Sequence, residues 1–322
     1  MNRVGIFGTG AYGISLALVA NHNNHDVIMW TKFDEERDYI RSNHENKVLP
    51  GIKIPDNIKV TSDLQEFTDN CDLIVVTLPV PFLKENFESL SKYDVSNKCF
   101  VFASKGILEK DYLMVYQIYE LYFNNPNYSV ISGPSFAIDI AHFDPICLSL
   151  YANTNKVNNM VKDVFVNDFF KFEIVDDIVG IELSGAIKNV FAIASGIVHG
   201  LDYSPSTISL FMSRAIHDLS DILINFTGDN RMLLTHCAIG DLILTCNSNN
   251  SRNYTYGMLL AKDREEAYNY LSSHTVEGYN TLKILIKMLN EKNFDIQVVS
   301  ILKRIIFDNE DIKIIEDYIL NK

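Results

Sequence analysis

The chain has 322 residues, of which 47% are hydrophobic and 21% charged, and its formal net charge is −13. This length allows two domains with sizeable cores, and the composition is typical of a soluble globular protein. The negative charge argues against nucleic acid or an anionic membrane as a general partner, so a phosphate-bearing ligand must be held by a few local cations and backbone amides.

Five cysteines are scattered along the sequence without any Cys-x-x-Cys pair. They predict neither a disulfide framework nor a metal site, and they favour a reducing compartment. The first residues resemble a strand rather than a signal peptide. The most apolar run, residues 189–198, is shorter than the roughly 20 residues that span a bilayer. We therefore expect a cytoplasmic protein.

The N-terminal segment is a short apolar strand that leads directly into G-T-G-A-Y-G at residues 8–13, a G-x-G-x-x-G turn, and then into small apolar residues that suit a helix. In that order, Gly8 allows a tight turn, Gly10 lets the backbone approach a pyrophosphate, and Gly13 lets helix and strand pack closely. The N–H groups at the start of the helix attract phosphate. The segment therefore predicts a dinucleotide site.

Further apolar segments alternate with helical ones in the first half of the chain. They predict a short element near Val60 and strands over residues 26–30, 71–78, 99–103, 128–131 and 146–150. This alternation predicts an α/β fold with a Rossmann-type, doubly wound sheet whose ligand lies at the carboxyl ends of the strands.

The pattern changes near Val175 and is helical almost to the end, over residues 179–199, 206–226, 232–234 and 282–289. We therefore expect a dinucleotide-binding domain over residues 1–177 and an all-α substrate-binding and catalytic domain over residues 178–322. Because no proline-rich or charged linker separates the halves, the expected boundary is a continuous helix entry.

Two motifs end predicted strands in the first half. Lys105, in S-K-G, can reach an oxygen of a bound cofactor or substrate, although a solvated loop lysine is the simpler interpretation of this motif alone. Gly133 and Ser135, in I-S-G-P-S-F-A, could offer a backbone amide and a hydroxyl to an anion. A strand-to-helix turn with a serine cap explains them equally well.

Lys188 lies in an apolar, small-residue helix with no acidic residue three or four positions away, and helical spacing places Ser184 and Ser195 near the same face. Because an ammonium group is costly to desolvate, a buried lysine is a candidate proton donor or acceptor. The alternative is a lysine whose head reaches solvent.

A third group of polar residues follows in the second half. Asp241 and Thr245 are one helical turn apart and could orient Lys188. Arg252 and Asn253 suit an oxyanion such as phosphate, because guanidinium donates hydrogen bonds in a planar pair. A helix start followed by a polar loop accounts for the same residues.

Taken in order, these motifs resemble the bacterial NAD(P)-dependent glycerol-3-phosphate dehydrogenases: G-T-G-A-Y-G, S-K-G, I-S-G-P-S-F-A, G-A-I-K-N-V, G-D-L-x-x-T-C and S-R-N. L-P-G at 49–51, I-P at 54–55 and V-E-G-Y at 276–279 extend the likeness over about residues 3–283. The resemblance implies reversible hydride transfer from NAD(P)H to dihydroxyacetone phosphate, giving sn-glycerol 3-phosphate for phospholipid synthesis. It also suggests a homodimer.

The resemblance implies roles for individual residues. The implied catalytic residues are Lys188, Lys105 and Asp241, with Lys188 protonating the alkoxide oxygen as hydride reaches the carbonyl carbon. The implied substrate-binding residues are Lys105, Gly133, Ser135, Lys188, Asp241, Ser251, Arg252 and Asn253. The implied cofactor-binding residues are Gly8, Gly10, Ala11, Tyr12, Gly13, Lys32, Lys105, Ala137, Arg252, Thr275 and Glu277.

Three positions depart from the family pattern or bear on the cofactor. Ala11 stands where many members have serine, and Ile208 stands where a basic residue is usual, which removes one polar contact. Lys32, after the second strand, favours the 2′-phosphate of NADP, although Asp34 and Glu35 follow closely. We expect NADP to be preferred and NAD tolerated.

Two alternatives compete with this interpretation. A two-domain reductase of the hydroxy-acid or ketopantoate type would share the glycine turn and a lysine, but should lack the combination of Lys105, S-G-P-S and S-R-N. A non-catalytic nucleotide-binding sensor would have no need of Lys105, Lys188, Asp241 and Arg252 together.

Overall fold

The computed structural model describes residues 1–320, and the chain divides into two compact units. The first comprises Met1–Lys105 and Val115–Ile178, and the second comprises Gly106–Met114 and the chain from Val179 onward. The chain enters the second unit at the start of a long helix. The short segment Gly106–Met114 also groups with the helical unit, which no motif in the sequence indicates.

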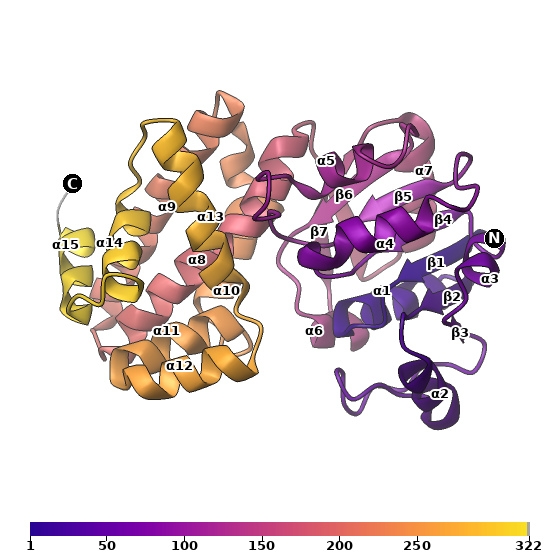
Figure 1. Cartoon of the computed structure of the whole chain (residues 1–322), viewed down its shortest axis with the longest axis horizontal. Coiled ribbons are helices and arrows are strands. Elements are labelled where there is room, and N and C mark those ends of the chain that lie inside the picture. The colour runs from indigo at the N-terminus through magenta and orange to yellow at the C-terminus, as the bar shows by residue number, and fades with distance from the viewer. Residues whose placement is uncertain (321–322) are drawn as a thin grey trace. The chain divides into compact units, whose positions relative to one another are not determined.

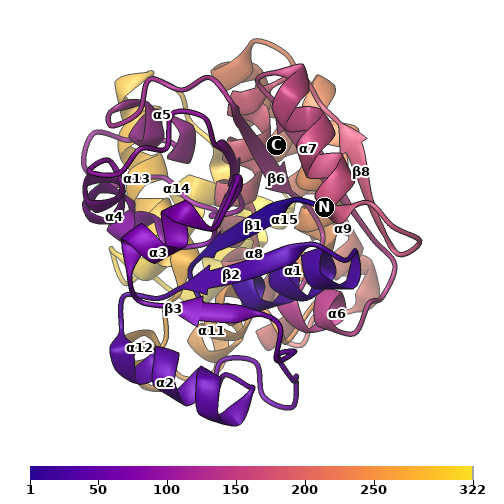
Figure 2. The ribbon, with the colours of Figure 1, turned by 90° about the vertical axis from the view of Figure 1, so that its right-hand side faces the viewer.

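The first unit is built on one eight-stranded sheet in the order β3-β2-β1-β4-β5-β6-β7-β8 (Figures 1 and 2). Its strands are β1 (Arg3–Phe7), β2 (Asp26–Trp30), β3 (Lys59–Thr61), β4 (Leu73–Val76), β5 (Cys99–Phe102), β6 (Tyr128–Ser132), β7 (Ile146–Ala152) and β8 (Phe170–Ile174). The strands from β3 to β6 are parallel to one another, with Gly5 in register with Ile28 on one side and Ile74 on the other. The predicted Rossmann-type sheet is confirmed.

Two features of the sheet differ from the prediction. β7 runs antiparallel to β6, with Ser132 opposite Ser149, so its amino end lies where β1 to β6 end. β8 was not predicted, because its sequence F-K-F-E-I alternates apolar and charged residues, whereas the predicted strands are continuous apolar runs. Such alternation suits a half-exposed edge strand.

Apolar side chains cover both faces of the sheet, as its buried strands require. On one face, α1 (Ala11–His22), α6 (Ala137–Ala141) and α7 (Asn155–Phe165) share an apolar core with the strands. On the other, aromatic rings from α4 (Leu83–Leu90) and α5 (Val115–Glu120) meet the sheet, with the Phe100 and Tyr119 centroids 4.8 Å apart. The remaining helices of this unit are α2 (Asp34–Asn43), α3 (Leu64–Asp69) and the short 3₁₀ segment η1 (Val80–Phe82).

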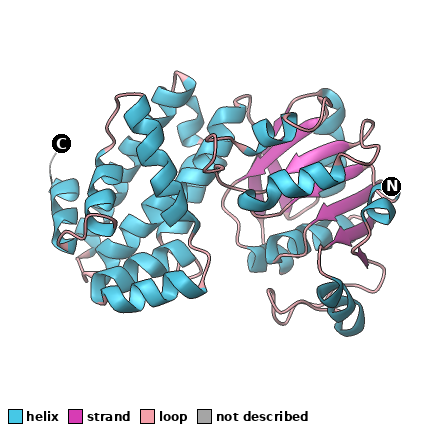
Figure 3. Ribbon diagram, in the orientation of Figure 1, coloured by secondary structure: helices cyan, strands magenta, loops and turns pink. Residues whose placement is uncertain are grey.

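The second unit is helical, as predicted, and contains none of the eight strands (Figure 3). Its helices are α8 (Ile178–Gly200), α9 (Pro205–Thr227), α10 (Asp241–Cys246), α11 (Arg252–Lys262), α12 (Arg264–Ser273), α13 (Glu277–Glu291), α14 (Gln297–Ile306) and α15 (Ile315–Leu320). Three shorter segments complete it: the 3₁₀ turns η2 (Arg231–Leu234) and η4 (Ile312–Ile314), and the π-helical turn η3 (His236–Gly240).

Local sequence explains the long helix α9. The Ser204 hydroxyl accepts a hydrogen bond from the backbone N–H of Thr207, and Pro205 occupies the first helical position, where its missing N–H is not needed. Gly228 then ends the helix in the left-handed conformation, with φ of 91°.

α8 is the core helix of the second unit. Among the described residues it alone is long and apolar enough to cross a membrane, and 83% of its most apolar 18-residue window is buried inside the structure. It extends well beyond the apolar run at 189–198 noted in the sequence. It also meets α11 closely, because a Cβ at Gly257 would lie 2.1 Å from the carbonyl oxygen of Ile193.

Candidate active site

In the first unit, the segments that follow β1, β4, β5 and β6 meet at the carboxyl edge of the sheet. The Gly8 N–H donates to the carbonyl of Trp30 at 3.0 Å, and the Thr77 hydroxyl donates to the carbonyl of Gly8 at 3.4 Å. The Lys105 ammonium donates to the carbonyl of Gly133 at 3.3 Å. The glycine turn, S-K-G and I-S-G-P-S-F-A therefore lie at one edge of the sheet, where ligands of open α/β sheets bind.

The glycine turn has the geometry that a pyrophosphate requires. Gly8 has φ of +129°, and a Cβ at Gly13 would lie 2.6 Å from the carbonyl oxygen of Gly8. A Cβ at Gly10 would meet nothing within 4 Å, so this part of the backbone faces open space. Gly10 is also the N-cap of α1 and offers no side-chain hydrogen bond to its first N–H groups. These groups fit the phosphates of a dinucleotide.

Ser135 and Ala137 lie beside the start of α1. The hydroxyls of Tyr12 and Ser135 are 3.0 Å apart. The Ser15 hydroxyl donates to the carbonyl of Ala137 at 2.6 Å and to that of Ala11 at 2.8 Å. Ser15 was not among the predicted site residues. In the structure it is marked out by a completely buried hydroxyl within an apolar helix.

The segment after β2 carries Lys32 on the surface. Its ammonium lies 2.5 Å from a carboxylate oxygen of Glu85, with the two side chains 53% and 63% exposed. Asp34, which follows, pairs instead with Arg37 at 2.7 Å. Glu85 was not predicted from the sequence, because the two partners are 53 residues apart and only the fold brings them together.

In the second unit, Lys188 on α8 pairs with Asp241, the first residue of α10, at 2.5 Å. The lysine side chain is 12% exposed and the carboxylate is completely buried. The Thr245 hydroxyl donates to the backbone carbonyl of Asp241 at 2.6 Å. The predicted arrangement of these three residues is therefore observed, and each buried charge has a partner, as burial requires.

A further network joins three helices next to Lys188. The Asn253 amide donates to the side-chain oxygen of Asn189 at 2.9 Å, and the Asn189 amide donates to Glu277 at 3.1 Å. The Gly278 N–H in turn donates to the side-chain oxygen of Asn253 at 2.8 Å. Asn189 was missed as a site residue, although it follows Lys188 directly in G-A-I-K-N-V.

The remaining predicted residues of the second unit lie at the start of α11 and on two other segments. The Ser251 hydroxyl caps the helix by accepting from the N–H of Tyr254 at 3.3 Å. Arg252 is exposed as the first helical residue, and Thr275 is exposed between α12 and α13. Ile208 is half-buried on α9 and brings no polar group where a basic residue was expected.

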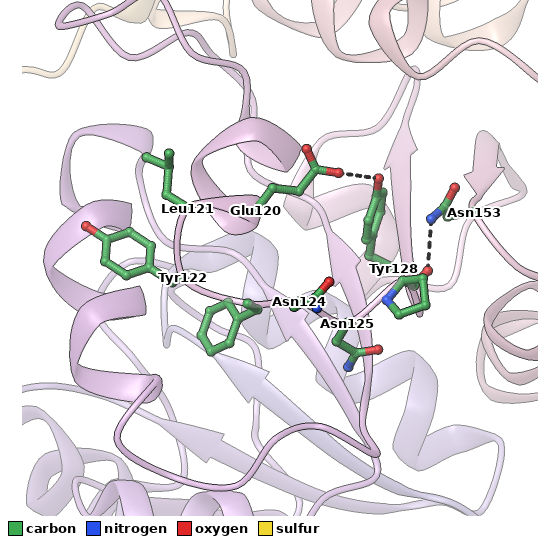
Figure 4. Close-up of a pocket in the computed structure, with 9 residues that line it drawn as sticks. Glu120, Leu121, Tyr122, Asn124, Asn125, Tyr128 and Asn153 are labelled. Carbon is green, nitrogen blue, oxygen red and sulfur yellow. Dashed lines mark hydrogen bonds between the residues drawn. The ribbon is translucent and has the colours of Figure 1, made fainter.

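A separate pocket of 580 Å³ opens in the first unit near the amino end of β6 (Figure 4). Its wall includes Glu120, Asn125, Tyr128 and Asn153, and none of the predicted site residues. The Tyr128 hydroxyl donates to Glu120 at 2.8 Å. Burial, reinforced by that carboxylate, raises the pKa of Tyr128, so the phenol remains protonated. Within residues 1–320, no cluster of His, Cys, Asp and Glu could hold a metal ion.

Comparison with known proteins gives consistent matches along the whole chain. A family model described as NAD-dependent glycerol-3-phosphate dehydrogenase N-terminus matches residues 3–158, and the corresponding C-terminus model matches residues 177–316. The glycerol-3-phosphate dehydrogenase [NAD(P)+] of Staphylococcus haemolyticus is 31% identical over 97% of this chain and 96% of the relative. That of Staphylococcus aureus is 32% identical with the same coverage.

The fold also matches a solved structure. The crystal structure of glycerol-3-phosphate dehydrogenase from Coxiella burnetii superposes with a TM-score of 0.92 at 23% identity, covering 100% of this chain and 99% of the other. This likeness supports the observed arrangement of a Rossmann-type sheet and a helical region.

Proposed function

The chain belongs to the family of NAD-dependent glycerol-3-phosphate dehydrogenases, and we therefore propose that it interconverts dihydroxyacetone phosphate and sn-glycerol 3-phosphate. One observation in the structure supports this most directly. A nearly buried lysine, Lys188, is held by a completely buried carboxylate, Asp241, in the helical unit. A proton donor in a fixed position is what reduction of a carbonyl needs.

We assign the proton transfer to Lys188. A reduced nicotinamide, when bound, would supply the hydride to the carbonyl carbon. The Lys188 ammonium gives a proton to the carbonyl oxygen, so that the carbonyl becomes a secondary alcohol. Asp241 holds the ammonium group in position and balances its charge, and Thr245 fixes Asp241. In the reverse direction the neutral lysine takes the proton back.

We assign recognition of the substrate phosphate to the start of α11. Arg252 is exposed there, and a guanidinium can bind two phosphate oxygens at once. The amino end of the helix adds its partial positive charge. Ser251 and Asn253 complete the proposed phosphate site, and Lys105, Gly133 and Ser135 are the contributors proposed from the sheet unit.

We assign the cofactor to the dinucleotide-binding region predicted over residues 1–177, and the substrate and chemistry mainly to the region predicted over residues 178–322. The proposed pyrophosphate site is the turn Gly8–Gly13, whose open backbone at Gly10 supports it. The other proposed cofactor residues are Ala11, Tyr12, Lys32, Lys105, Ala137, Arg252, Thr275 and Glu277. The cofactor is NAD or NADP, and Lys32 is the proposed partner of a 2′-phosphate.

We further propose a cytoplasmic homodimer that supplies glycerol 3-phosphate for phospholipid synthesis. The resemblance in sequence supports this assignment. Light scattering on the purified protein measures the oligomeric state directly, and a mass of one chain across the working concentration range would contradict the dimer.

The test of the proposed function is the loss of reduced-nicotinamide absorbance when the protein is mixed with dihydroxyacetone phosphate, with NADH and NADPH run in parallel. We expect rapid oxidation that disappears when unphosphorylated dihydroxyacetone replaces the substrate. A folded sample that binds a reduced cofactor but oxidises neither would overturn the proposal.

A further inference from the structure

The ion pair between Lys32 and Glu85 lies across the proposed dinucleotide site. Lys32 follows β2 by two residues, whereas Glu85 lies on α4, which follows β4 through η1. β2 and β4 are the two neighbours of β1 in the sheet. The pair therefore bridges from one side of β1 to the other, at the edge where β1 runs into the glycine turn.

Two other carboxylates near the end of β2 form hydrogen bonds with groups other than Lys32. Asp34 accepts a hydrogen bond from Arg37 at 2.7 Å, and Glu36 accepts one from the Asn46 amide at 2.9 Å. The Asn46 amide also donates to the carbonyl of Thr9 in the glycine turn at 3.0 Å, which fixes that network to the backbone. Glu85 is thus the carboxylate that holds the cation proposed for a 2′-phosphate.

We propose that Glu85 is a specificity-determining residue for the cofactor, an inference that rests on the proposed function for the presence of a nicotinamide dinucleotide. By pairing with Lys32, Glu85 withholds that cation from a 2′-phosphate and limits the preference for NADP that Lys32 alone would give. A free 2′-hydroxyl carries no charge, so binding of NAD is almost indifferent to the pair.

Because both side chains are exposed, a phosphate can replace Glu85 as the partner of Lys32. Lys32 and Glu85 are each more than half exposed, so water and salt screen their attraction and a phosphate dianion can displace the carboxylate. The phosphate must break the attraction between Lys32 and Glu85 before it can bind the ammonium, and this lowers the net gain from Lys32. We expect removal of Glu85 to strengthen NADPH binding about fivefold, the size of one exposed charge–charge interaction.

The experiment measures binding of NADPH and of NADH to the full-length protein by nicotinamide fluorescence at low ionic strength. The variants are Glu85→Gln, Lys32→Gln and the double variant, each checked for folding by thermal unfolding. The matched control is Glu88→Gln, which removes the same charge from an exposed position of the same helix. The ratio of kcat/KM values for the two cofactors is the second readout.

Glu85→Gln should lower the Kd for NADPH about fivefold and change that for NADH by less than about twofold, whereas Glu88→Gln should leave both within about twofold. With Lys32 replaced by Gln, the effect of Glu85→Gln should shrink to less than about twofold. An unchanged NADPH-to-NADH ratio in Glu85→Gln, an equal effect of Glu88→Gln, or a full effect without Lys32 would overturn this inference alone. Binding of neither cofactor by the folded wild-type protein would overturn the proposed function with it.

Discussion

The two units of this chain each hold a lysine–carboxylate pair, with the same separation and opposite surroundings. Lys188 and Asp241 in the helical unit are 2.5 Å apart, and their side chains are 12% and 0% exposed. Lys32 and Glu85 in the sheet unit are also 2.5 Å apart, but 53% and 63% exposed. Burial, rather than the distance between the charged atoms, therefore decides what such a pair can do.

Burial changes both the energy and the use of the pair. Breaking a buried pair by removing one partner costs about 3–5 kcal/mol, because it leaves a charge without a partner. An exposed pair contributes only about 0–1 kcal/mol and exchanges partners easily. The buried pair therefore suits chemistry, which needs a fixed proton donor, and the exposed pair suits recognition, which needs a cation that can be released to a ligand.

The largest effect should come from removing the buried ammonium. Lys188→Ala should lower kcat on the order of 10²- to 10⁴-fold, because a general acid acts in the transition state, while the Kd for the reduced cofactor holds. Steady-state kinetics and fluorescence titration measure the two quantities separately. Lys262→Ala, at an exposed position at the end of α11, is the control. A near-normal kcat in Lys188→Ala would show that another group donates the proton.

The next effect compares the two carboxylates directly. Asp241→Asn should lower the free energy of unfolding by about 3 kcal/mol, because it removes the buried carboxylate that pairs with the Lys188 ammonium. Glu85→Gln should change it by less than about 1 kcal/mol, since both partners remain hydrated. Urea unfolding of the two variants against the wild type measures both values. Equal losses in the two variants would show that burial does not set the strength of these pairs.

Arg252 tests whether an exposed cation of the helical unit serves recognition rather than chemistry. Arg252→Ala should raise the KM for dihydroxyacetone phosphate about 10- to 100-fold, the loss expected for hydrogen bonds to a charged group. Arg252→Lys should recover part of the loss, because it restores the charge without the planar pair of donors. If KM stays normal and only kcat falls, the phosphate site lies elsewhere.

The sequence predicted those features that depend on local pattern. The glycine turn, the buried parallel strands and the helical second half all follow from residue spacing, and G-A-I-K-N-V pointed to a lysine without a local acidic partner. The partnership with Asp241 could be suggested only through the separate G-D-L-x-x-T-C motif. The structure brings the two residues together from positions 53 residues apart.

Features that depend on contacts between residues far apart in the sequence were not predicted. Glu85 is an ordinary surface glutamate on α4 until the sheet order places it near Lys32. Asn189 gains its importance from partners on α11 and α13. β8 was missed because its apolar residues alternate with charged ones. β7 runs antiparallel to β6, a direction that no local pattern indicates.

The smallest effect concerns another exposed pair of the sheet unit, between Arg3 and Asp72. Two contacts join them, at 3.0 and 2.5 Å, and the side chains are 46% and 42% exposed. The hydrogen bond from Arg3, followed by its charge, lowers the pKa of Asp72 in the folded protein. The stabilisation is therefore complete above the unfolded-state pKa of about 4 and is lost as pH falls through the lower folded-state pKa.

Asp72→Asn should accordingly lower the free energy of unfolding at neutral pH by less than about 1 kcal/mol, and the difference from wild type should vanish in acid. Added salt should also reduce the difference, because both side chains lie in water. Urea unfolding across that pH range at two ionic strengths measures both dependences. A loss of the size expected for Asp241→Asn, insensitive to salt, would mean that exposure does not weaken a pair held by two hydrogen bonds. The exposed Lys32–Glu85 pair would then be too stable for a phosphate to displace Glu85 from Lys32.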